Sequence, residues 1–287
     1  MTYQTLISVP ELQLLMRDRA SEIVVLDASH DLFDPTLGRK NYQASHLPGA
    51  HFVSLDTDMG GQKTGTNGRH PLPEREHVVD VMRGLGVNDD TQVIVYDQCE
   101  GMHAARVWWT LLWLGHRDVA VLDGGLKAWQ RHGGQTESVV PAQAPAGNFS
   151  DRGVGMPVVT YEDLLHNIDT RERLVVDARA EDRFAGQNET LDPVGGHIPG
   201  AVNHFYKHNL NPDGTFKTSE QLTAQFQALI GQRRAEFLVM QCGSGVSACH
   251  NLLALQMVGL GTAPLYVGSW SEWCSREGAP IATGAHE

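Results

Sequence analysis

The residues best suited to carry out a chemical reaction form a short loop at 242–247, which reads Cys-Gly-Ser-Gly-Val-Ser. An apolar run at 237–241 precedes it and is typical of a buried strand in a parallel sheet. The segment 248–257 follows, with apolar residues at helical spacing, and Gly259 is the expected stop. We therefore expect Cys242 at the carboxyl end of a strand, in a loop that leads into a helix.

This position would suit a nucleophilic sulfur. Loop N–H groups and the positive end of the helix dipole would face Cys242, and such surroundings favour the reactive thiolate over the thiol. Two glycines, Gly243 and Gly245, allow the backbone to wrap closely around an anion. The alternative interpretation is a small apolar filler of the core, which is the usual role of an unpaired cysteine.

The other three cysteines lack this setting. Cys249 falls on the expected helix and Cys274 follows a tryptophan-rich segment, so both are interpreted as packing residues. Cys99 lies beside Asp97 and Glu100, whose charges would raise its pKa. The sequence contains no Cys-x-x-Cys pair, and we expect neither a metal site nor a cofactor.

Composition restricts the partners. The 287 residues suffice for one large domain or two ordinary ones. With 34 acidic and 22 basic residues, the net charge is −12, which argues against nucleic acid and against anionic membranes as partners. An anionic substrate would therefore need a local group of arginines or backbone donors, because the overall field repels it.

The chain shows no sign of export or membrane insertion. No apolar run approaches the length of a membrane span, and the first residues lack the pattern of a signal peptide. Four cysteines without a regular framework indicate a reducing compartment. We expect a cytoplasmic protein.

The two halves of the chain repeat the same sequence patterns in the same order. The matching segments are 23–28 with 174–179, 45–50 with 196–201, 93–97 with 238–242, and 122–129 with 266–273. A duplicated domain of about 130 to 150 residues explains this order and the nearly constant spacing.

Each copy alternates helical and strand patterns, which predicts an α/β unit with a mainly parallel sheet. Each also opens with a capping box, at 8–11 and at 160–163. We expect an N-terminal domain at 1–140, a Pro/Ala-rich linker at 141–155 and a C-terminal domain at 156–287.

The repeat aligns Asp97 of the first copy with Cys242 of the second. A carboxylate cannot carry sulfur, and the donors around it would bind it as an internal anion. We therefore expect an inactive N-terminal domain, a catalytic C-terminal domain and one active site per chain.

Two His-x-Pro-Gly-Ala turns, a Gly-x-Trp-x-x-Trp segment at 268–273 and the Cys242 loop resemble the rhodanese superfamily of sulfurtransferases. The resemblance covers nearly the whole chain and implies two tandem rhodanese-like domains. The loop is similar to that of 3-mercaptopyruvate sulfurtransferases. Thiosulfate-preferring members typically carry Arg and Lys where this chain has Gly243 and Ser244.

The resemblance implies covalent catalysis in two steps. Cys242 would attack the sulfur of 3-mercaptopyruvate, release pyruvate and become a persulfide. The outer sulfur would then pass to cyanide, a small thiol or thioredoxin. The loop residues Gly243, Gly245, Val246 and Ser247 would bind the substrate and stabilise the thiolate and the persulfide through backbone N–H groups.

The resemblance also implies a relay of Ser244, His70 and Asp56. Ser244 would polarise the substrate, although a small residue that lets the loop turn is an equal alternative. His70 lies in a polar segment without strand or helix periodicity, where histidines are commonly just solvated. Asp56 would orient His70, with Asp58 as the other candidate.

Arg183 resembles the arginine with which the family binds the substrate carboxylate, a contact suited to a bidentate guanidinium. The alternative is a surface ion pair with Glu181 or Asp182. Mercaptopyruvate enzymes often carry a second arginine just before the second turn, but 187–194 contains none. This departure leaves the donor open, so thiosulfate:cyanide sulfurtransferase is the alternative activity.

Two further interpretations compete. A Cys-x5-Arg phosphatase would need arginine at the position of Ala248, so this activity is disfavoured. A non-catalytic sulfur carrier or interaction module fits the copy with Asp97 better than the copy with an intact cysteine loop.

Overall fold

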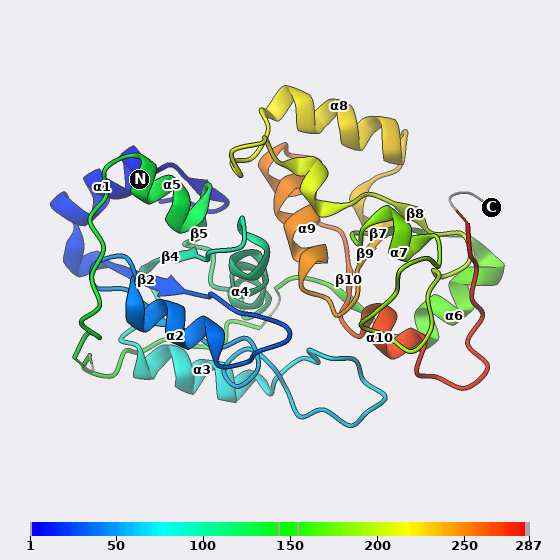
Figure 1. The fold of residues 1–287 in the computed structure, drawn as a ribbon, viewed down its shortest axis with the longest axis horizontal. Helices are drawn as coiled ribbons and strands as arrows, with labels where there is room; N and C mark the ends of the chain where they lie inside the picture. The colour runs from blue at the N-terminus through cyan, green and yellow to red at the C-terminus, as the bar shows by residue number, and fades with distance from the viewer. Residues whose placement is uncertain (1, 143, 154, 285–287) are drawn as a thin grey trace. The chain divides into compact units, whose positions relative to one another are not determined.

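The computed structural model describes residues 2–142, 144–153 and 155–284, which form two compact units (Figure 1). The first unit comprises Met1–Gly61, Pro73–Met156 and Pro212–Phe216. The second comprises Gln62–Leu72, Pro157–Asn211 and Lys217–Glu287. The short segment Gln62–Leu72, which carries His70, thus belongs to the same unit as Cys242.

The first unit is a five-stranded parallel sheet with helices around it, in the strand order β1-β5-β4-β2-β3. Its elements are β1 (Leu6–Ile7), α1 (Val9–Asp18), a 3-10 turn (Ala20–Glu22), β2 (Ile23–Asp27), α2 (Leu37–Ala44), β3 (His51–Phe52), α3 (Arg75–Gly84), β4 (Gln92–Tyr96), α4 (Met102–Trp113), β5 (Val119–Leu122) and α5 (Gly125–Arg131).

The second unit repeats this architecture with the strand order β6-β10-β9-β7-β8, again all parallel. Its elements are β6 (Val158–Val159), α6 (Tyr161–Thr170), β7 (Leu174–Asp177), α7 (Glu181–Phe184), β8 (Val202–Asn203), a 3-10 turn (Tyr206–Asn209), α8 (Ser219–Ile230), a 3-10 turn (Ala235–Phe237), β9 (Leu238–Gln241), α9 (Ser247–Met257), β10 (Leu265–Tyr266) and α10 (Ser269–Trp273). Strand for strand, the two orders match, which agrees with the duplication seen in the sequence.

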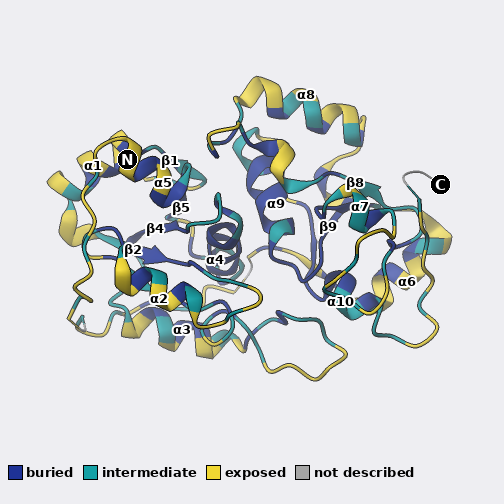
Figure 2. Ribbon diagram, viewed as in Figure 1, coloured by how far each residue is buried: buried dark blue, intermediate teal, exposed yellow. Residues whose placement is uncertain are grey.

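Alternating strand residues divide each core into two layers. In the second unit, Val239 packs with Tyr266, Trp270 and Trp273 in a cluster between the sheet and the helices α6 and α10. The helix α9, which follows the Cys242 loop, packs against β9 and α8 and is buried from Ala248 to Leu255 (Figure 2). This burial on nearly all sides explains the continuous apolar character of the helix.

Local sequence signals set several element ends. Ser8 accepts the N–H of Glu11 and Thr160 accepts the N–H of Asp163, and both capping boxes are complete, as predicted. The strand expected from Phe237 begins one residue later, at Leu238. Phe237 instead ends a 3-10 turn with its side chain half exposed, where Arg234 lies over its ring.

The connector expected at 141–155 packs on the first unit over part of its described length. The N–H of Gly147 donates to the carbonyl of Arg83, and that of Phe149 donates to Val87. The Phe149 side chain is fully buried. Within the described ranges, no helix is both long and apolar enough to cross a bilayer.

Candidate functional site

Cys242 lies where the sequence predicts it, directly after β9 and ahead of α9. The side chain is buried, with 1% of its surface exposed. Gly245 adopts a positive φ of 73°, a conformation that side chains disfavour. The loop thus turns sharply and brings the amino-terminal end of α9 next to the thiol.

The helix α10 fixes the backbone of the loop. The Cys242 N–H donates to Ser269 Oγ at 3.1 Å, and this hydroxyl donates in turn to the Tyr266 carbonyl at 2.8 Å. The N–H groups of Trp270 and Ser271 donate to the carbonyls of Cys242 and Gly243. These bonds fix the backbone from which the Cys242 side chain extends.

The matching loop of the first unit shows what this loop shape can bind. There Asp97 follows β4, and its carboxylate accepts four backbone N–H groups, from Cys99, Gly101, His103 and Ala104, at 2.7 to 2.9 Å. The loops 97–101 and 242–246 have equal length. The first joins β4 to α4 and the second joins the corresponding elements β9 and α9. The loop shape is therefore an anion cradle, filled by a carboxylate in the first unit and offered to Cys242 in the second.

Ser244 and His70 come together in the second unit. Ser244 Oγ lies 2.9 Å from His70 Nδ1, although the two residues are 174 positions apart in the chain. Both side chains are buried, so the pair is shielded from bulk water. This contact lets the imidazole exchange a proton with the serine hydroxyl beside the cysteine loop.

Asp56 belongs to the first unit, where its carboxylate lies 3.9 Å from Nδ1 of His30. Asp58, the other candidate, also lies there and accepts the N–H of Ser54 at 2.7 Å. Because His70 is in the second unit, a relay that includes Asp56 stays a prediction.

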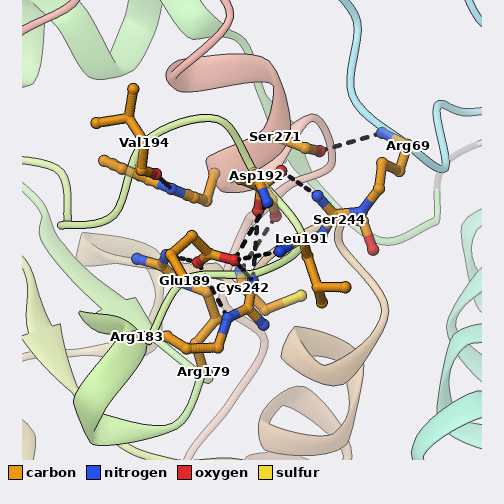
Figure 3. Close-up of polar contacts among 12 residues, drawn as sticks. Arg69, Arg179, Arg183, Glu189, Leu191, Asp192, Val194, Cys242, Ser244 and Ser271 are labelled. Carbon is orange, nitrogen blue, oxygen red and sulfur yellow. Dashed lines mark hydrogen bonds and ion pairs between the residues drawn. The ribbon is translucent and has the colours of Figure 1, made fainter. Parts of the chain in front are cut away.

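Arginines and carboxylates meet beside the cysteine loop (Figure 3). Arg183 forms a bidentate pair with Glu189, at 2.9 and 3.0 Å, and reaches Asp192 Oδ2 at 3.3 Å. Arg69, from the segment that carries His70, pairs with Asp192 Oδ1. In the part of the chain that the structure describes, the Arg183 side chain thus pairs with Glu189 and Asp192 rather than with Glu181 or Asp182, and it lies beside the cysteine loop.

Arg179 has a structural place in the same cluster. Its guanidinium pairs with Asp177 at 2.6 Å, donates to the Gly196 carbonyl and lies 4.6 Å from the centre of the Trp270 ring. It is almost fully buried, and these contacts use most of its donors. Arg179 thus ties β7, the second His-x-Pro-Gly turn and α10 together.

Burial raises and the arginines lower the pKa values of the two carboxylates, Glu189 and Asp192. For Glu189, burial disfavours the charge, but hydrogen bonds from Arg183 and two backbone N–H groups outweigh it and lower its pKa. For Asp192, burial dominates over the attraction of Arg69 and Arg183, and its pKa is raised. Asp192 is therefore the less stably charged member of the cluster.

Comparison with known proteins identifies the fold. The model of the rhodanese-like domain matches residues 8–132 and 160–276. The chain belongs to the rhodanese-like family. A probable 3-mercaptopyruvate sulfurtransferase of Pseudomonas aeruginosa is 42% identical over 274 residues, which cover 95% of this chain and 96% of that protein.

Other members of the rhodanese-like family extend the comparison. The thiosulfate sulfurtransferase of Mus musculus is 35% identical and matches 88% of this chain and 85% of its own length. The solved structure of the 3-mercaptopyruvate sulfurtransferase from Leishmania major superposes with a TM-score of 0.82 at 28% identity, covering 94% of this chain and 74% of that one. The predicted family and the predicted pair of α/β domains are both confirmed.

Sequence reasoning missed several residues that surround Cys242 in this rhodanese-like chain: Arg69, Glu189, Asp192 and Ser269. None falls on a periodic segment, and three lie in loops. A usable signal was present in the acidic pair at 189 and 192, since buried acids in a loop without basic residues need cations from elsewhere.

The remaining cysteines behave as structural residues. Burial, and then the charge of Asp97, raises the pKa of Cys99 to about 12, and burial raises the pKa of Cys274 to about 11. Cys249 is fully buried, with its thiol 3.3 Å from the Gly245 carbonyl. Among the residues described, no cluster of His, Cys, Asp or Glu could hold a metal ion.

Proposed function

We propose that the protein is a sulfurtransferase that takes sulfur from 3-mercaptopyruvate, holds it as a Cys242 persulfide and passes it to a thiol or to cyanide. The observation that carries the proposal is Cys242 itself, placed in a loop whose counterpart binds a carboxylate with four N–H groups. Relatives named 3-mercaptopyruvate sulfurtransferase support the donor.

In the first half-reaction, the Cys242 thiolate attacks the sulfur of the donor. A sulfur–sulfur bond forms and the carbon–sulfur bond breaks, with its electron pair left on carbon as the enolate of pyruvate. The enolate takes up the proton that the donor thiol gives up, and pyruvate leaves. Ser244 and His70, 2.9 Å apart, are the groups that we assign to this proton transfer.

In the second half-reaction, the acceptor attacks the outer sulfur of the persulfide. The sulfur–sulfur bond breaks, Cys242 returns as a thiolate, and cyanide becomes thiocyanate or a thiol becomes a persulfide. Both states of Cys242 are anions, so the same N–H groups of Gly243, Gly245, Val246 and Ser247 stabilise each of them. Small thiols and thioredoxin are the acceptors we propose beside cyanide.

A further assignment belongs to the proposal. Arg183 binds the carboxylate of the donor. We also propose the cytoplasm as its compartment, because four cysteines without a regular framework favour a reducing environment.

The test compares kcat/KM for 3-mercaptopyruvate and thiosulfate with cyanide as the common acceptor. We expect a preference of about tenfold or more for 3-mercaptopyruvate. Cys242→Ser should lower turnover by about a thousandfold or more, whereas the matched control Cys274→Ser should keep it. Turnover that survives in Cys242→Ser would overturn the assignment of the nucleophile.

Thiosulfate is the second candidate donor. The named thiosulfate sulfurtransferases among the relatives, at 35% identity, favour it, as does the lack of arginine in 187–194. A preference for thiosulfate in the same assay would establish this activity instead. Activity with neither donor would favour a sulfur carrier or interaction module.

A further inference from the structure

Two arginines hold one carboxylate beside the cysteine loop. Arg69 Nη1 pairs with Oδ1 of Asp192, and Arg183 Nη2 pairs with Oδ2 at 3.3 Å (Figure 3). The two guanidiniums thus bind opposite oxygens of the same group. Such a pair recognises a carboxylate by shape as well as by charge.

The pair reaches the residue next to the nucleophile. A Cβ atom placed on Gly243 would lie 2.6 Å from Arg69 Nη2 and 3.7 Å from Arg183 Nη2. A side chain at this position would push the Arg69 guanidinium away, whereas Arg183 would remain in ordinary contact. A carboxylate bound between the two arginines would therefore lie close to Cys242, the neighbour of Gly243.

Asp192 is a replaceable partner of these arginines. Its side chain is 3% exposed, and burial raises its pKa in spite of the two cations. Arg183 keeps a bidentate bond to Glu189 when Asp192 leaves. Within the described part of the chain, Arg69 Nε is buried without a hydrogen-bond partner, so this guanidinium has a donor to offer.

We propose that Arg69 and Arg183 form the clamp for the donor carboxylate, and that Asp192 occupies this clamp until the donor displaces it. Arg69 would then supply the second arginine that 187–194 lacks. The inference rests on the proposed function and adds Arg69 as a specificity-determining residue with Asp192 as its internal competitor.

The clamp favours a 2-oxo acid donor over thiosulfate for a geometric reason. Four bonds separate the sulfur of 3-mercaptopyruvate from its carboxylate oxygens, whereas two separate the transferable sulfur of thiosulfate from its oxygens. Thiosulfate bound at Cys242 therefore reaches the clamp less well. Loss of Arg69 should raise KM for 3-mercaptopyruvate more than KM for thiosulfate and change kcat little.

The test measures pyruvate binding by calorimetry, because pyruvate carries the carboxylate without the reactive sulfur. Arg69→Gln should weaken binding about tenfold or more, since charge-assisted hydrogen bonds are lost. Asp192→Asn should tighten binding several-fold, since the competing carboxylate is gone. The charge-matched exposed controls Arg233→Gln and Asp169→Asn should bind like the wild type.

A second readout separates this inference from the proposed function. Mass spectrometry after treatment with 3-mercaptopyruvate shows whether Cys242 takes up one sulfur, and absence of uptake in the wild type overturns the proposed function. If uptake occurs while both Arg69→Gln and Asp192→Asn bind pyruvate like the wild type, the clamp is wrong. If either variant fails to fold, Arg69→Lys provides the test. Lysine keeps the charge but cannot form the two parallel hydrogen bonds of a guanidinium. Unchanged pyruvate affinity in this variant would overturn the clamp.

Discussion

Asp97 and Cys242 hold matching places in loops of equal length, yet the chemistry open to them differs. Asp97 is fully buried, and its two oxygens satisfy four N–H groups that would otherwise lack acceptors. Asp97 thus fills the anion cradle of the first unit and stabilises its fold, whereas Cys242 leaves the cradle of the second unit to a reactive sulfur. The same backbone serves either purpose because it recognises negative charge rather than a particular side chain.

We expect Asp97→Ala to lower the free energy of unfolding of the first unit by about 3 kcal/mol or more, because buried donors lose a charged acceptor. Urea denaturation measures the change. The exposed variant Asp90→Ala serves as the control and should stay within about 0.5 kcal/mol of the wild type. A loss below about 1 kcal/mol in Asp97→Ala would show that the cradle does not need its carboxylate.

The raised pKa values of Cys99 and Cys274 predict a pH-dependent reactivity. Iodoacetamide attacks the thiolate, and thiols with pKa values of about 12 and about 11 are almost wholly protonated at neutral pH. At pH 8, labelling of both should therefore be about a hundredfold or more slower in the native Cys242→Ser protein than in urea.

Labelling of Cys274 and Cys99 should then rise about tenfold per pH unit as the pH climbs toward their pKa values. Peptide mass spectrometry follows each site separately, and the urea-denatured protein gives the reference rate. Native labelling that equals the denatured rate at pH 8 would contradict the raised pKa values.

Among the elements, the segment Gln62–Leu72 contributes most to the site without any regular structure. It brings Arg69 and His70 to the cysteine loop, and the Arg69 N–H donates to Ser271 Oγ of α10 at 3.1 Å. Gly68 makes this approach possible: a Cβ there would lie 2.6 Å from the Gly268 carbonyl oxygen. Backbone packing, rather than secondary structure, therefore positions the segment.

Gly68→Ala and Gly65→Ala form a matched pair that tests this view. Both glycines have a positive φ, 84° and 91°, but a Cβ on Gly65 would meet nothing within 4 Å. Alanine at 68 must push the segment away from α10, and we expect kcat/KM to fall about tenfold to a hundredfold as His70 and Arg69 shift. Gly65→Ala carries the same backbone strain and should keep kcat/KM near the wild-type value. Equal losses in the two variants would assign the effect to strain alone.

The sequence predicts those features that depend on neighbouring residues, and it does not predict contacts between distant segments. The strand before Cys242, the helix after it and both capping boxes depend on neighbours within a few residues, and the structure has them. Arg69 and Asp192 meet across 123 positions, between two loops without periodicity, and no local pattern records that contact. The start of β9 differed for a local reason, since the turn at Ala235–Phe237 takes the first expected residue out of the strand.

On the scale of the whole chain, the two units share the same order of strands but differ in their charged residues. The strands β2 and β7 end alike, at Asp27 and Asp177, each of which accepts the N–H two residues later. That later residue is Ser29 in the first unit and Arg179 in the second. The two units thus share these backbone contacts, while the guanidinium and the thiol occur together only in the second unit.

This asymmetry predicts that each chain takes up one sulfur atom. Treatment with excess 3-mercaptopyruvate, without an acceptor, should add one sulfur to the intact mass, and peptide mapping should place it on Cys242. Cys99 lies in the matching loop of the first unit, but its pKa of about 12 keeps it a thiol, and Asp97 already fills the cradle beside it. The variant Cys99→Ser should therefore still take up one sulfur, whereas Cys242→Ser should take up none. A second sulfur in the wild type that disappears in Cys99→Ser would show that the first unit also carries sulfur, and the cradle filled by Asp97 would then need another explanation.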